Sequence, residues 1–384
     1  MKLHRIIAVA QKEWREIVRD RMFFALAFVL PVVWMLVFGY GMTLDVQNIP
    51  FAVIDYDHSA MSRDYAHHFI ASRYFDFKGY LASPREADQL LAKGSLRLII
   101  VIPEHFEQDL TAGRHAQVGT LLDGTFANRT QTVQGYVEAV NRSISDGLRA
   151  RRIAQRLGIP LERAQYLAQP VHIELRYLYN QALRSIWSIA PSLLMFTLML
   201  VPPMLTALVV VREKESGAIY NIYVSTVSRG EFLAGKLLPG VAISFADAIV
   251  LWLLAVYYFG APFKGSVWFF LLATLVYVIC TCSIGLFVST LVRTQNAALM
   301  ITTILAIIPA IQFSGMLTPI STLGGAAYIQ AHLFPAMYYE DVVMGVFLKG
   351  VGWDVLWQKL AVLAGYSAIL IAASYLGFRK RQRT

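Results

Sequence analysis

The chain has 384 residues, of which 57% are hydrophobic and only 15% are charged, and its net charge is +9. This composition excludes an ordinary soluble protein of that length and is typical of a protein with several membrane-spanning segments. Much of the positive charge lies in short segments that flank apolar stretches. We therefore expect it to face a membrane surface, and we expect no nucleic-acid partner.

Residues 1–21 are predicted to form an amphipathic helix that lies on the cytoplasmic surface of the membrane. Its apolar side contains Leu3, Ile6, Ile7, Ala10, Trp14, Ile17 and Val18. Its basic side contains Arg5, Lys12, Arg15 and Arg19. A plain membrane-surface anchor shows the same pattern, and this interpretation is compatible with a further role.

A membrane-spanning helix needs about 20 mostly apolar residues. Six stretches meet this requirement, namely residues 22–44, 186–211, 237–259, 267–292, 297–317 and 360–378. Only the third contains a fully charged residue, Asp247. Cys280 and Cys282 fall in the fourth, where they point to different faces of a helix, so we expect no structural disulfide between them.

The short segments between the six stretches differ sharply in charge. Fifteen Lys and Arg residues lie on one side, and three lie on the other. Because basic residues in short loops accumulate on the cytoplasmic side, both termini and the basic tail 379–384 are predicted to be cytoplasmic. Residues 45–185 are then extracytoplasmic, and the chain is predicted to be an α-helical polytopic membrane protein with six transmembrane helices.

The segment 45–185 is long enough for one inserted domain. Its apolar runs alternate with helix-capping signals, which predicts an α/β fold. The predicted strands are 49–55, 96–102, 117–122 and 171–177, and the predicted helices are 84–93, 103–112 and 125–157. Ser83 and Glu86 form a capping box before the first helix, and Gly94 is its expected C-cap. The last helix is expected to break near Gly147.

The segment 212–236 connects the second and third predicted spans and is charged at both ends. Apolar or semi-apolar residues recur in its middle at helical spacing, namely Ile219, Ile222, Tyr223, Thr226 and Val227. This pattern predicts a short helix with one apolar face, and an ordinary amphipathic linker has the same pattern. Gly230, Gly235 and Lys236 match the start of a phosphate-binding loop, but Leu237 replaces the Ser or Thr that would hold Mg²⁺, so we expect no nucleotide there.

Pro309 lies within the fifth predicted span and is expected to kink it. The region 318–355 that follows contains two semi-apolar stretches, 326–332 and 335–346, which are too short to cross a membrane. We expect them to form re-entrant or outer helices.

These stretches resemble ABC-2 type transporter permeases. The resemblance rests on Glu213-x-Glu215-x-Gly217, on Glu231 and on Gly235-Lys236-Leu237-Leu238-Pro239. In that family the equivalent loop forms a coupling helix, which docks on a separate ATPase subunit that holds ATP and Mg²⁺. The resemblance therefore implies a role in ATPase coupling for Glu213, Glu215, Gly217, Ile219, Ile222, Tyr223 and Glu231.

Further motifs extend the resemblance over essentially the whole chain. They are Arg19-Asp20-Arg21; Val53-Ile54-Asp55, Ser59-x-x-Ser62-Arg63, Ile102-Pro103-x-x-Phe106 and Asp123-Gly124-Thr125 in the inserted segment; and Ser314-Gly315, Pro319, Gln330, Pro335, Tyr338 and Gly345-Val346-Phe347-Leu348-Lys349-Gly350. After span five two family positions differ: Gly324-Gly325 stands where proline is common, and Met344 replaces a common arginine. In the loop after Gly217, Ala218 and Ile219 stand where the family often has Thr and Glu, and Thr226-Val227 stands where it often has Thr-Pro. These departures leave the architecture intact and put the role of that arginine in doubt.

Candidates for a translocation path lie in the third and fifth spans. Asp247 is eleven residues beyond Lys236, which places it about 16 Å into the membrane at the helical rise. A carboxylate at that depth either lines a path for substrate or protons, or locks helices together through hydrogen bonds. Gln312, Ser314 and Gly315 are weaker candidates, since polar residues of this kind often simply link helices.

No set of residues suited to catalysis, cofactor binding or metal binding stands out, and His58, His67 and His68 lack a matching second pair of ligands. The resemblance implies the permease subunit of an ATP-driven exporter in a bacterial inner membrane, with a second permease subunit, identical or homologous. It also implies a periplasmic adaptor protein and an outer-membrane channel, which favours efflux of drugs or other amphiphilic compounds.

Two alternatives stay open. The first is a proton-coupled secondary transporter that uses Asp247, which predicts internal repeats and more charges inside the membrane. The second is a membrane-anchored binding or scaffold protein, which leaves five of the six spans without a role.

Overall fold

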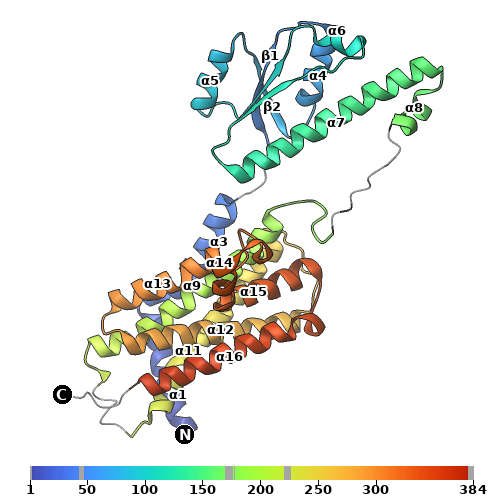
Figure 1. Ribbon diagram of the computed structural model, residues 1–384. Coiled ribbons are helices and arrows are strands. Elements are labelled where there is room, and N and C mark those ends of the chain that lie inside the picture. The colour runs from blue at the N-terminus through green and yellow to red at the C-terminus, as the bar shows by residue number, and fades with distance from the viewer. Residues whose placement is uncertain (1, 43–46, 169–175, 177, 220–225, 379–384) are drawn as a thin grey trace. The chain divides into compact units, whose positions relative to one another are not determined.

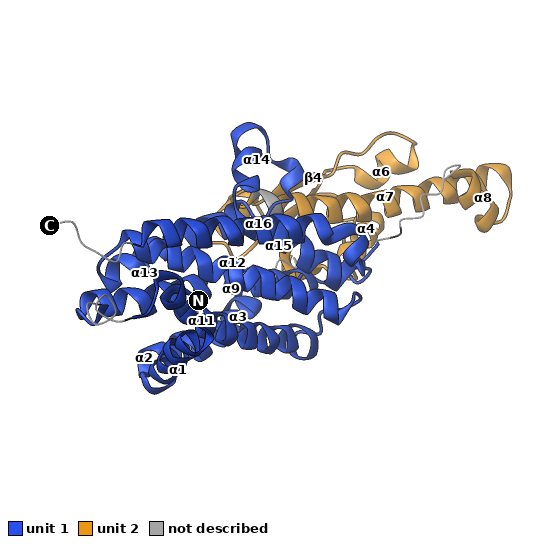
Figure 2. Cartoon of the chain, turned by 90° about the horizontal axis from the view of Figure 1, so that it is seen from below, with its two compact units in different colours: residues 1–44, 177–384 blue, residues 45–176 orange. Residues whose placement is uncertain are grey.

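The computed structural model describes residues 2–42, 47–168, 176, 178–219 and 226–378. The chain divides into two compact units (Figure 2). The first unit combines residues 1–44 with residues 177–384, and the second consists of residues 45–176. Residues 178–185 therefore belong to the first unit, whereas the sequence assigns them to the inserted segment.

The first unit is a bundle of helices (Figure 1). Its α-helices are α1 (Leu3–Arg19), α2 (Arg21–Phe24), α3 (Leu30–Gly41), α9 (Ile186–Glu215), α11 (Arg229–Leu253), α12 (Val267–Leu291), α13 (Gln295–Gln312), α14 (Gly325–His332), α15 (Pro335–Met344) and α16 (Trp353–Gly377). Three short π-helical segments, Ala25–Val29, Leu254–Tyr258 and Gly345–Lys349, continue α2, α11 and α15, and Ile320–Thr322 is a turn of 3-10 helix.

Within the described residues, six helices are long and apolar enough to cross a membrane, the number that the sequence predicts. They are Arg21–Gly41, Ile186–Glu215, Arg229–Tyr258, Val267–Leu291, Gln295–Gln312 and Trp353–Gly377. The bounds differ most around the connecting loop, after the fifth span and at the start of the sixth, which begins seven residues earlier than predicted. The second helix ends four residues later, the third begins eight residues earlier, and the fifth ends at Gln312 instead of residue 317.

Helix α9 is the centre of the bundle, with 94% of its most apolar window buried. Helix α12 approaches it closely because Gly285 has no side chain: a Cβ atom there would lie 2.1 Å from the backbone oxygen of Pro203. The short helix α15 also packs against α9 and α12. Its Tyr339 stacks on Tyr277 of α12 with ring centroids 3.9 Å apart and hydrogen-bonds to Thr274 at 2.8 Å. The sequence correctly predicts two short helices, α14 and α15, in this region.

The second unit is built on a four-stranded sheet of β1 (Ile49–Asp55), β2 (Phe75–Tyr80), β3 (Leu98–Ile102) and β4 (Gly119–Leu122). The strand order is β2-β1-β3-β4. Strands β2 and β3 run parallel to β1, and β4 runs antiparallel to β3. The helices are α4 (Ala60–Ile70), α5 (Pro84–Ala92), α6 (Phe106–Thr111), α7 (Ala127–Leu157) and α8 (Leu161–Ala168).

Successive residues of β1 face opposite sides of this sheet, as expected for a strand. Phe51 and Val53 pack in a core that also contains residues of α4 and α7, whereas Ala52 and Ile54 pack against α5. Because both faces are covered, the strand is apolar along its whole length. Figure 1 shows α7 running along one side of the sheet and α5 on the other.

Most of the elements predicted in this unit are present. The strands near 49–55, 96–102 and 117–122 and the helices near 84–93 and 103–112 are confirmed, and Gly94 has a φ of 71° as expected for a C-cap. The predicted break near Gly147 is wrong, because α7 continues without interruption to Leu157. Elements α4, β2 and α8 were not predicted, and the predicted strand 171–177 lies outside the described residues.

Candidate functional site

Three helices from distant parts of the sequence meet at one end of the bundle. They are α1, the last turn of α9 and the first two turns of α11, and we call this region the junction. The sequence assigns residues 212–236 to a connecting loop, but the helices occupy both ends of that segment. Ser228 and Glu231 explain the early start of α11, since their side chains and backbone amides form a reciprocal capping box. The two helices are therefore connected by residues 216–228, which we call the loop 216–228; residues 220–225 lie outside the described residues.

A buried ion cluster of Lys12, Glu13, Glu213 and Lys236 holds the junction together. The Lys236 ammonium group lies 2.9 Å from the Glu213 carboxylate and also donates a hydrogen bond to Glu13. Lys12 donates to the same Glu213 oxygen and lies 3.8 Å from Glu13. The side chain of Lys236 is fully buried, and that of Lys12 is half-exposed. Two cations and two carboxylates thus compensate one another across three helices.

The geometry makes this cluster sensitive to the loss of a single partner. Removing one member of a buried ion pair costs roughly 3–5 kcal/mol, because the remaining charge stays buried without compensation. The second oxygen of Glu213 already lacks a hydrogen-bond partner among the described residues. Lys236 faces both carboxylates, so it is the residue on which the cluster depends most.

The pKa values of the two α1 residues reflect this environment. Burial raises the pKa of Glu13, and the neighbouring ammonium group of Lys236 offsets only part of that effect. Burial alone would lower the pKa of Lys12, but its hydrogen bond to Glu213 and the nearby carboxylates raise the pKa above the ordinary value. Lys12 therefore stays charged at neutral pH, whereas Glu13 takes up a proton at a higher pH than an ordinary glutamate does.

Close packing supports the ionic contacts. Ile6, Glu13 and Ile17 form the buried side of α1. Opposite this helix, Gly235 of α11 allows direct contact: a Cβ atom there would lie 2.6 Å from Val9 Cβ and 3.1 Å from the Ile6 backbone oxygen. A side chain at position 235 would therefore push α1 away from α11.

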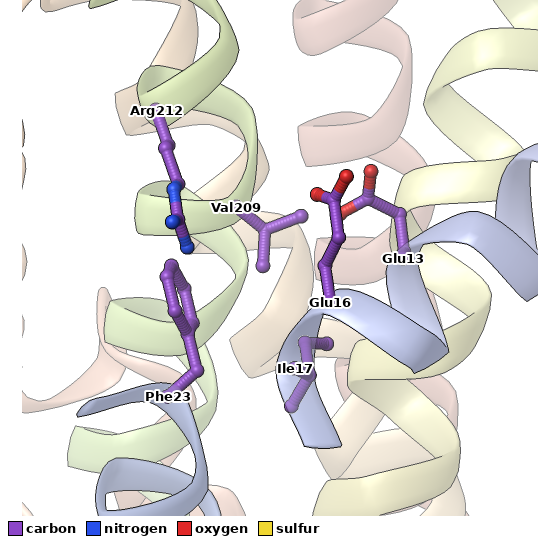
Figure 3. A pocket seen from close by; sticks show the side chains of 6 residues that line it. All are labelled: Glu13, Glu16, Ile17, Phe23, Val209 and Arg212. Atoms are coloured by element: carbon purple, nitrogen blue, oxygen red, sulfur yellow. The ribbon is translucent and has the colours of Figure 1, made fainter. Parts of the chain in front are cut away.

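Arg212 ties the end of α1 to α9. It donates a 2.7 Å hydrogen bond to Asp20, and its guanidinium carbon lies 5.1 Å from the centroid of the Phe23 ring. Figure 3 shows Arg212 directed toward this ring, with Glu13 and Glu16 of α1 facing the same small pocket. The pocket has a volume of about 10 Å³, so it admits at most a water molecule. The junction is thus closely packed at this point.

Glu231 ties the start of α1 to α11. It accepts a 2.6 Å hydrogen bond from the backbone amide of Lys2 and a 2.9 Å bond from that of Ser228, and it lies 3.7 Å from Arg5. Arg5 also donates to the backbone oxygen of Thr226. The two ends of α1 are therefore bound to different helices, with the ion cluster between them.

The last turn of α9 has further contacts with α12 and α13. Lys214 donates to the backbone oxygen of Ser289, near the end of α12. Glu215 accepts hydrogen bonds from the backbone and side-chain nitrogens of Gln295, at the start of α13, over 3.1 and 2.8 Å. Gly217 then ends the turn with a φ of 75°, a conformation that strongly favours glycine. The end of α9 is thus connected to most of the bundle.

The structure places the predicted coupling residues in different environments. Glu213, Ile219 and Glu231 are buried, and the partners of Glu213 are Lys12 and Lys236. Ile219 packs in an apolar cluster of the junction that includes Phe232 and Phe378. Ile222 and Tyr223 lie outside the described residues.

Sequence reasoning missed Lys12, Glu13 and Lys236 as members of the site. A signal was present for Glu13, which lies seven residues after Ile6 and four before Ile17, on the side of the helix that becomes buried. An acid at such a position needs a buried cation. Lys236 was considered as part of a phosphate-loop pattern and of a family motif, but not as a member of an ion pair. Residues 230–236 lie within helix α11.

The other side of α1 remains exposed and partly apolar. Leu3, Ile7, Trp14 and Val18 are each more than two-fifths exposed, and their spacing places them along one stripe of the helix. This stripe agrees with a helix that rests on a membrane surface or against another protein.

The candidate path residues do not form one cluster. Asp247 is buried in α11 and makes no hydrogen bond or ion pair with any described residue. Gln312 is exposed at the end of α13. Ser314 is buried just beyond it and donates a hydrogen bond to the Ala310 backbone oxygen, and Gly315 has a φ of 96°. The contacts of Ser314 shape the end of α13.

Comparison with known proteins identifies the family. The family model described as ABC-2 family transporter protein matches residues 21–376. Over 381 residues the chain is 28% identical to a probable multidrug ABC transporter permease, YbhS, of Escherichia coli, covering 98% of this chain and 97% of that protein. It is 24% identical over 380 residues to the related permease YbhR, covering 98% and 99%. The inner membrane transport permease YhhJ is 23% identical over 333 residues, covering 86% and 85%. With six apolar helices of membrane-spanning length and a match along almost its entire length, the chain belongs to the ABC-2 family of transporter proteins.

Proposed function

We propose that the chain is the permease subunit of an ATP-driven exporter, and that the junction couples it to a separate ATPase subunit carrying ATP and Mg²⁺. The observation that supports this proposal is the buried ion cluster of Lys12, Glu13, Glu213 and Lys236, which joins three helices. A displacement of α1 or of the loop 216–228 would move the ends of α9 and α11 together. Such a connection converts a movement at the membrane surface into a movement of transmembrane helices.

The contact with the ATPase would be made by the loop 216–228, with Ile222 and Tyr223, and by the exposed stripe of α1. The buried acids would act inside the junction, behind the surface that contacts the ATPase. Glu213 and Glu231 hold α1 against α9 and α11, and Glu215 connects α9 to α13, so these residues transmit the movement without touching the partner. Gly217 permits the sharp end of α9, and Ile219 packs behind it.

The remaining features of the proposal follow from charge and family. Both termini and the junction face the cytoplasm of a bacterial cell, and the second unit lies outside the inner membrane, since basic residues of short loops stay inside. A second permease subunit completes the translocation path. A periplasmic adaptor and an outer-membrane channel continue it. Drugs or other amphiphilic compounds are the proposed cargo because two of the relatives are named as probable multidrug permeases.

Asp247 is the residue proposed to line the path, together with Gln312, Ser314 and Gly315. Asp247 supports this role best, because it is buried at membrane depth and has no hydrogen-bond partner among the described residues. An acid in that position is available to a cationic group on a cargo molecule.

Coupling is tested with the double variant Glu213→Gln and Glu215→Gln in the full transporter with its ATPase. We expect the ATPase subunit still to co-purify, while cargo-stimulated ATP hydrolysis and export both fall. Glu16→Gln is the matched control, because Glu16 is an acid on α1 whose side chain is 46% exposed. Export at the wild-type level by the double variant would remove the junction from the mechanism, and failure of any ATPase to co-purify with the wild-type chain would contradict the proposed function itself.

Topology is tested by labelling single cysteines in intact cells with a reagent that does not cross membranes. Gln165→Cys in α8 and Ala326→Cys in α14 should label from outside, and Gln11→Cys in α1 should label only after the membrane is opened. All three positions are exposed, whereas the natural Cys280 and Cys282 are buried and give little background. Labelling of Gln11→Cys in intact cells would reverse the proposed orientation.

A further inference from the structure

A groove lies between α11 and α16 on the surface of the first unit. It has a volume of about 620 Å³, and helix α12 forms its floor with Leu286. Its walls contain small residues at a spacing of four, Gly230 and Ala234 on α11 and Ala368 and Ala372 on α16. The larger side chains of Leu233, Leu237, Ile371, Tyr375 and Leu376 complete the lining. Small residues normally allow two membrane helices to approach closely. Here α16 packs mainly on α12 instead, and the space between the two small faces is open.

The length of this groove is close to that of one leaflet of a bilayer. Its lining residues run from Gly230 to Leu237 on α11 and from Ala368 to Leu376 on α16. Eight or nine residues of helix extend over about 12–14 Å. One leaflet of the hydrocarbon core is about 15 Å thick, so the groove is long enough to cover most of one acyl chain.

The groove is almost entirely apolar, and a basic residue directly precedes its first lining residue in the sequence. Arg229 is exposed and directly precedes the lining residue Gly230. The nearby Glu231 is already bound by Arg5 and by the backbone amide of Lys2, so its charge is compensated within the protein. An apolar groove beside an exposed arginine is complementary to an acyl chain with an anionic headgroup.

Selectivity between one lipid and another is expected to come from the headgroup and not from the acyl chain. Moving an acyl chain from the bilayer into an apolar groove gains little, because lipid tails are as apolar as the groove. The charge of the headgroup does distinguish one lipid from another, since each Lys or Arg near the surface adds to the binding of anionic lipids. We propose that this groove binds one acyl chain of an anionic phospholipid of the bilayer, with its phosphate at Arg229. The proposal is independent of the cargo and of the ATPase.

The site is tested by photo-crosslinking of the full-length protein in phosphatidylethanolamine vesicles. The vesicles contain a trace of phosphatidylglycerol with a photoreactive group on its acyl chain, and parallel samples contain phosphatidylcholine with the same chain. Adducts are located by mass spectrometry. We expect phosphatidylglycerol to label peptides that contain residues 230–237 and 368–376 more strongly than phosphatidylcholine does. Equal labelling by the two lipids would contradict the proposal.

Variants distinguish lipid binding in the groove from general contact with the surrounding bilayer lipids. Ala234→Leu and Ala372→Leu fill the groove and should abolish most of the labelling by phosphatidylglycerol at these peptides. Ala364→Leu is the matched control, because it is an exposed alanine on α16 that does not line the groove. If Ala234→Leu fails to fold, Ala372→Leu decides the question, since Ala372 is exposed and tolerates a larger side chain. Wild-type labelling of Ala372→Leu would overturn the proposal.

The headgroup contact has its own test. In Arg229→Gln, the preference for phosphatidylglycerol over phosphatidylcholine should fall about fivefold, because a basic residue near the headgroup has been removed. An unchanged preference would contradict the assignment of the phosphate to Arg229. A cationic amphiphile, tetraphenylphosphonium, is added as a competitor. If it displaces the lipid label more effectively than unlabelled phosphatidylglycerol does, the groove binds cargo and the proposal fails.

Discussion

Glu213 at the junction and Glu340 in α15 are both buried glutamates, with exposed fractions of 5% and 3%, but their partners differ. Glu213 has two ammonium groups beside it, those of Lys12 and Lys236. Glu340 has only the hydroxyl of Ser192, at 2.5 Å, and its second oxygen has no partner among the described residues. A buried carboxylate keeps its charge only with a cation close by, so Glu340 is expected to be protonated.

This difference shows what each region contributes. The junction holds its helices together by charge, which acts over several ångströms and across three helices at once. Helix α15 holds its place by packing and hydrogen bonds, including the stacked Tyr277 and Tyr339, and its glutamate contributes one neutral hydrogen bond. The junction should therefore respond strongly to charge changes, and α15 should not.

The largest effect is expected for Lys236→Met. The variant removes the cation that faces two buried carboxylates, so the free energy of unfolding should fall by roughly 3–5 kcal/mol. Denaturation of the purified protein in mixed micelles measures this loss. Lys12→Met is the matched control: because Lys12 is half-exposed, its loss should cost at most about 1 kcal/mol. Equal losses in the two variants would mean that burial does not control the cluster.

A smaller effect is expected for Gly235→Ala, which changes no charge. The new Cβ meets Val9 and the backbone of Ile6, so α1 has to shift, at a cost of about 1–3 kcal/mol. Hydrogen exchange of α1 should become faster. Gly365→Ala, in α16, is the control because a Cβ there meets no atom within 4 Å. If exchange in α1 is unchanged, packing at Gly235 does not hold the helix.

A double variant then tests whether the charges act as one unit. Glu13→Gln combined with Lys236→Met removes a cation and an acid, and leaves Lys12 with Glu213. We expect the double variant to be more stable than the sum of the two single losses indicates, with a coupling energy of about 0.5–3 kcal/mol. The same denaturation experiment on the four proteins gives this energy. Simple additivity would show that the two residues act independently.

The smallest effect is expected for Glu340→Gln. A glutamine amide preserves the size of the side chain and its hydrogen bond to Ser192, so the free energy of unfolding should change by less than about 1 kcal/mol. Glu340→Ala is the companion variant, since it removes both the hydrogen bond and the packing and should cost more. A loss for Glu340→Gln as large as that for Lys236→Met would mean that Glu340 is charged and that the contrast between the two regions is false.

Composition and periodicity were sufficient to predict the general architecture. Long apolar runs predict the six membrane helices because the bilayer imposes a minimum length. In the second unit, β1 and β3 are apolar on both faces and were predicted, whereas β2 contains Asp76, Lys78 and Gly79 and was not. An edge strand of mixed composition has no distinctive signal of its own.

The junction was only partly predictable, for a different reason. The ends of α9 and α11 extend beyond the apolar runs because charged residues there find partners in α1. Glu13 and Lys236 are 223 residues apart in the sequence, and neither position indicates the other. A span prediction based on hydropathy therefore stops near residues 211 and 237, whereas the helices continue to Glu215 and begin at Arg229.

The distance between Glu13 and Lys236 also constrains how the chain is made. A ribosome adds about 5–20 residues per second, so roughly 10–45 s pass between the synthesis of Glu13 and that of Lys236. During this time α1 and α3 are already at the membrane, while α9, the central helix, has still to follow the 45–176 unit. Helix α3 contains no charged residue, so it can remain in lipid before the other helices pack against it. Until Lys236 is made, the cation beside Glu13 in the cluster is Lys12, which precedes it in α1. The order of synthesis thus favours a structure in which the last charge to appear completes the cluster.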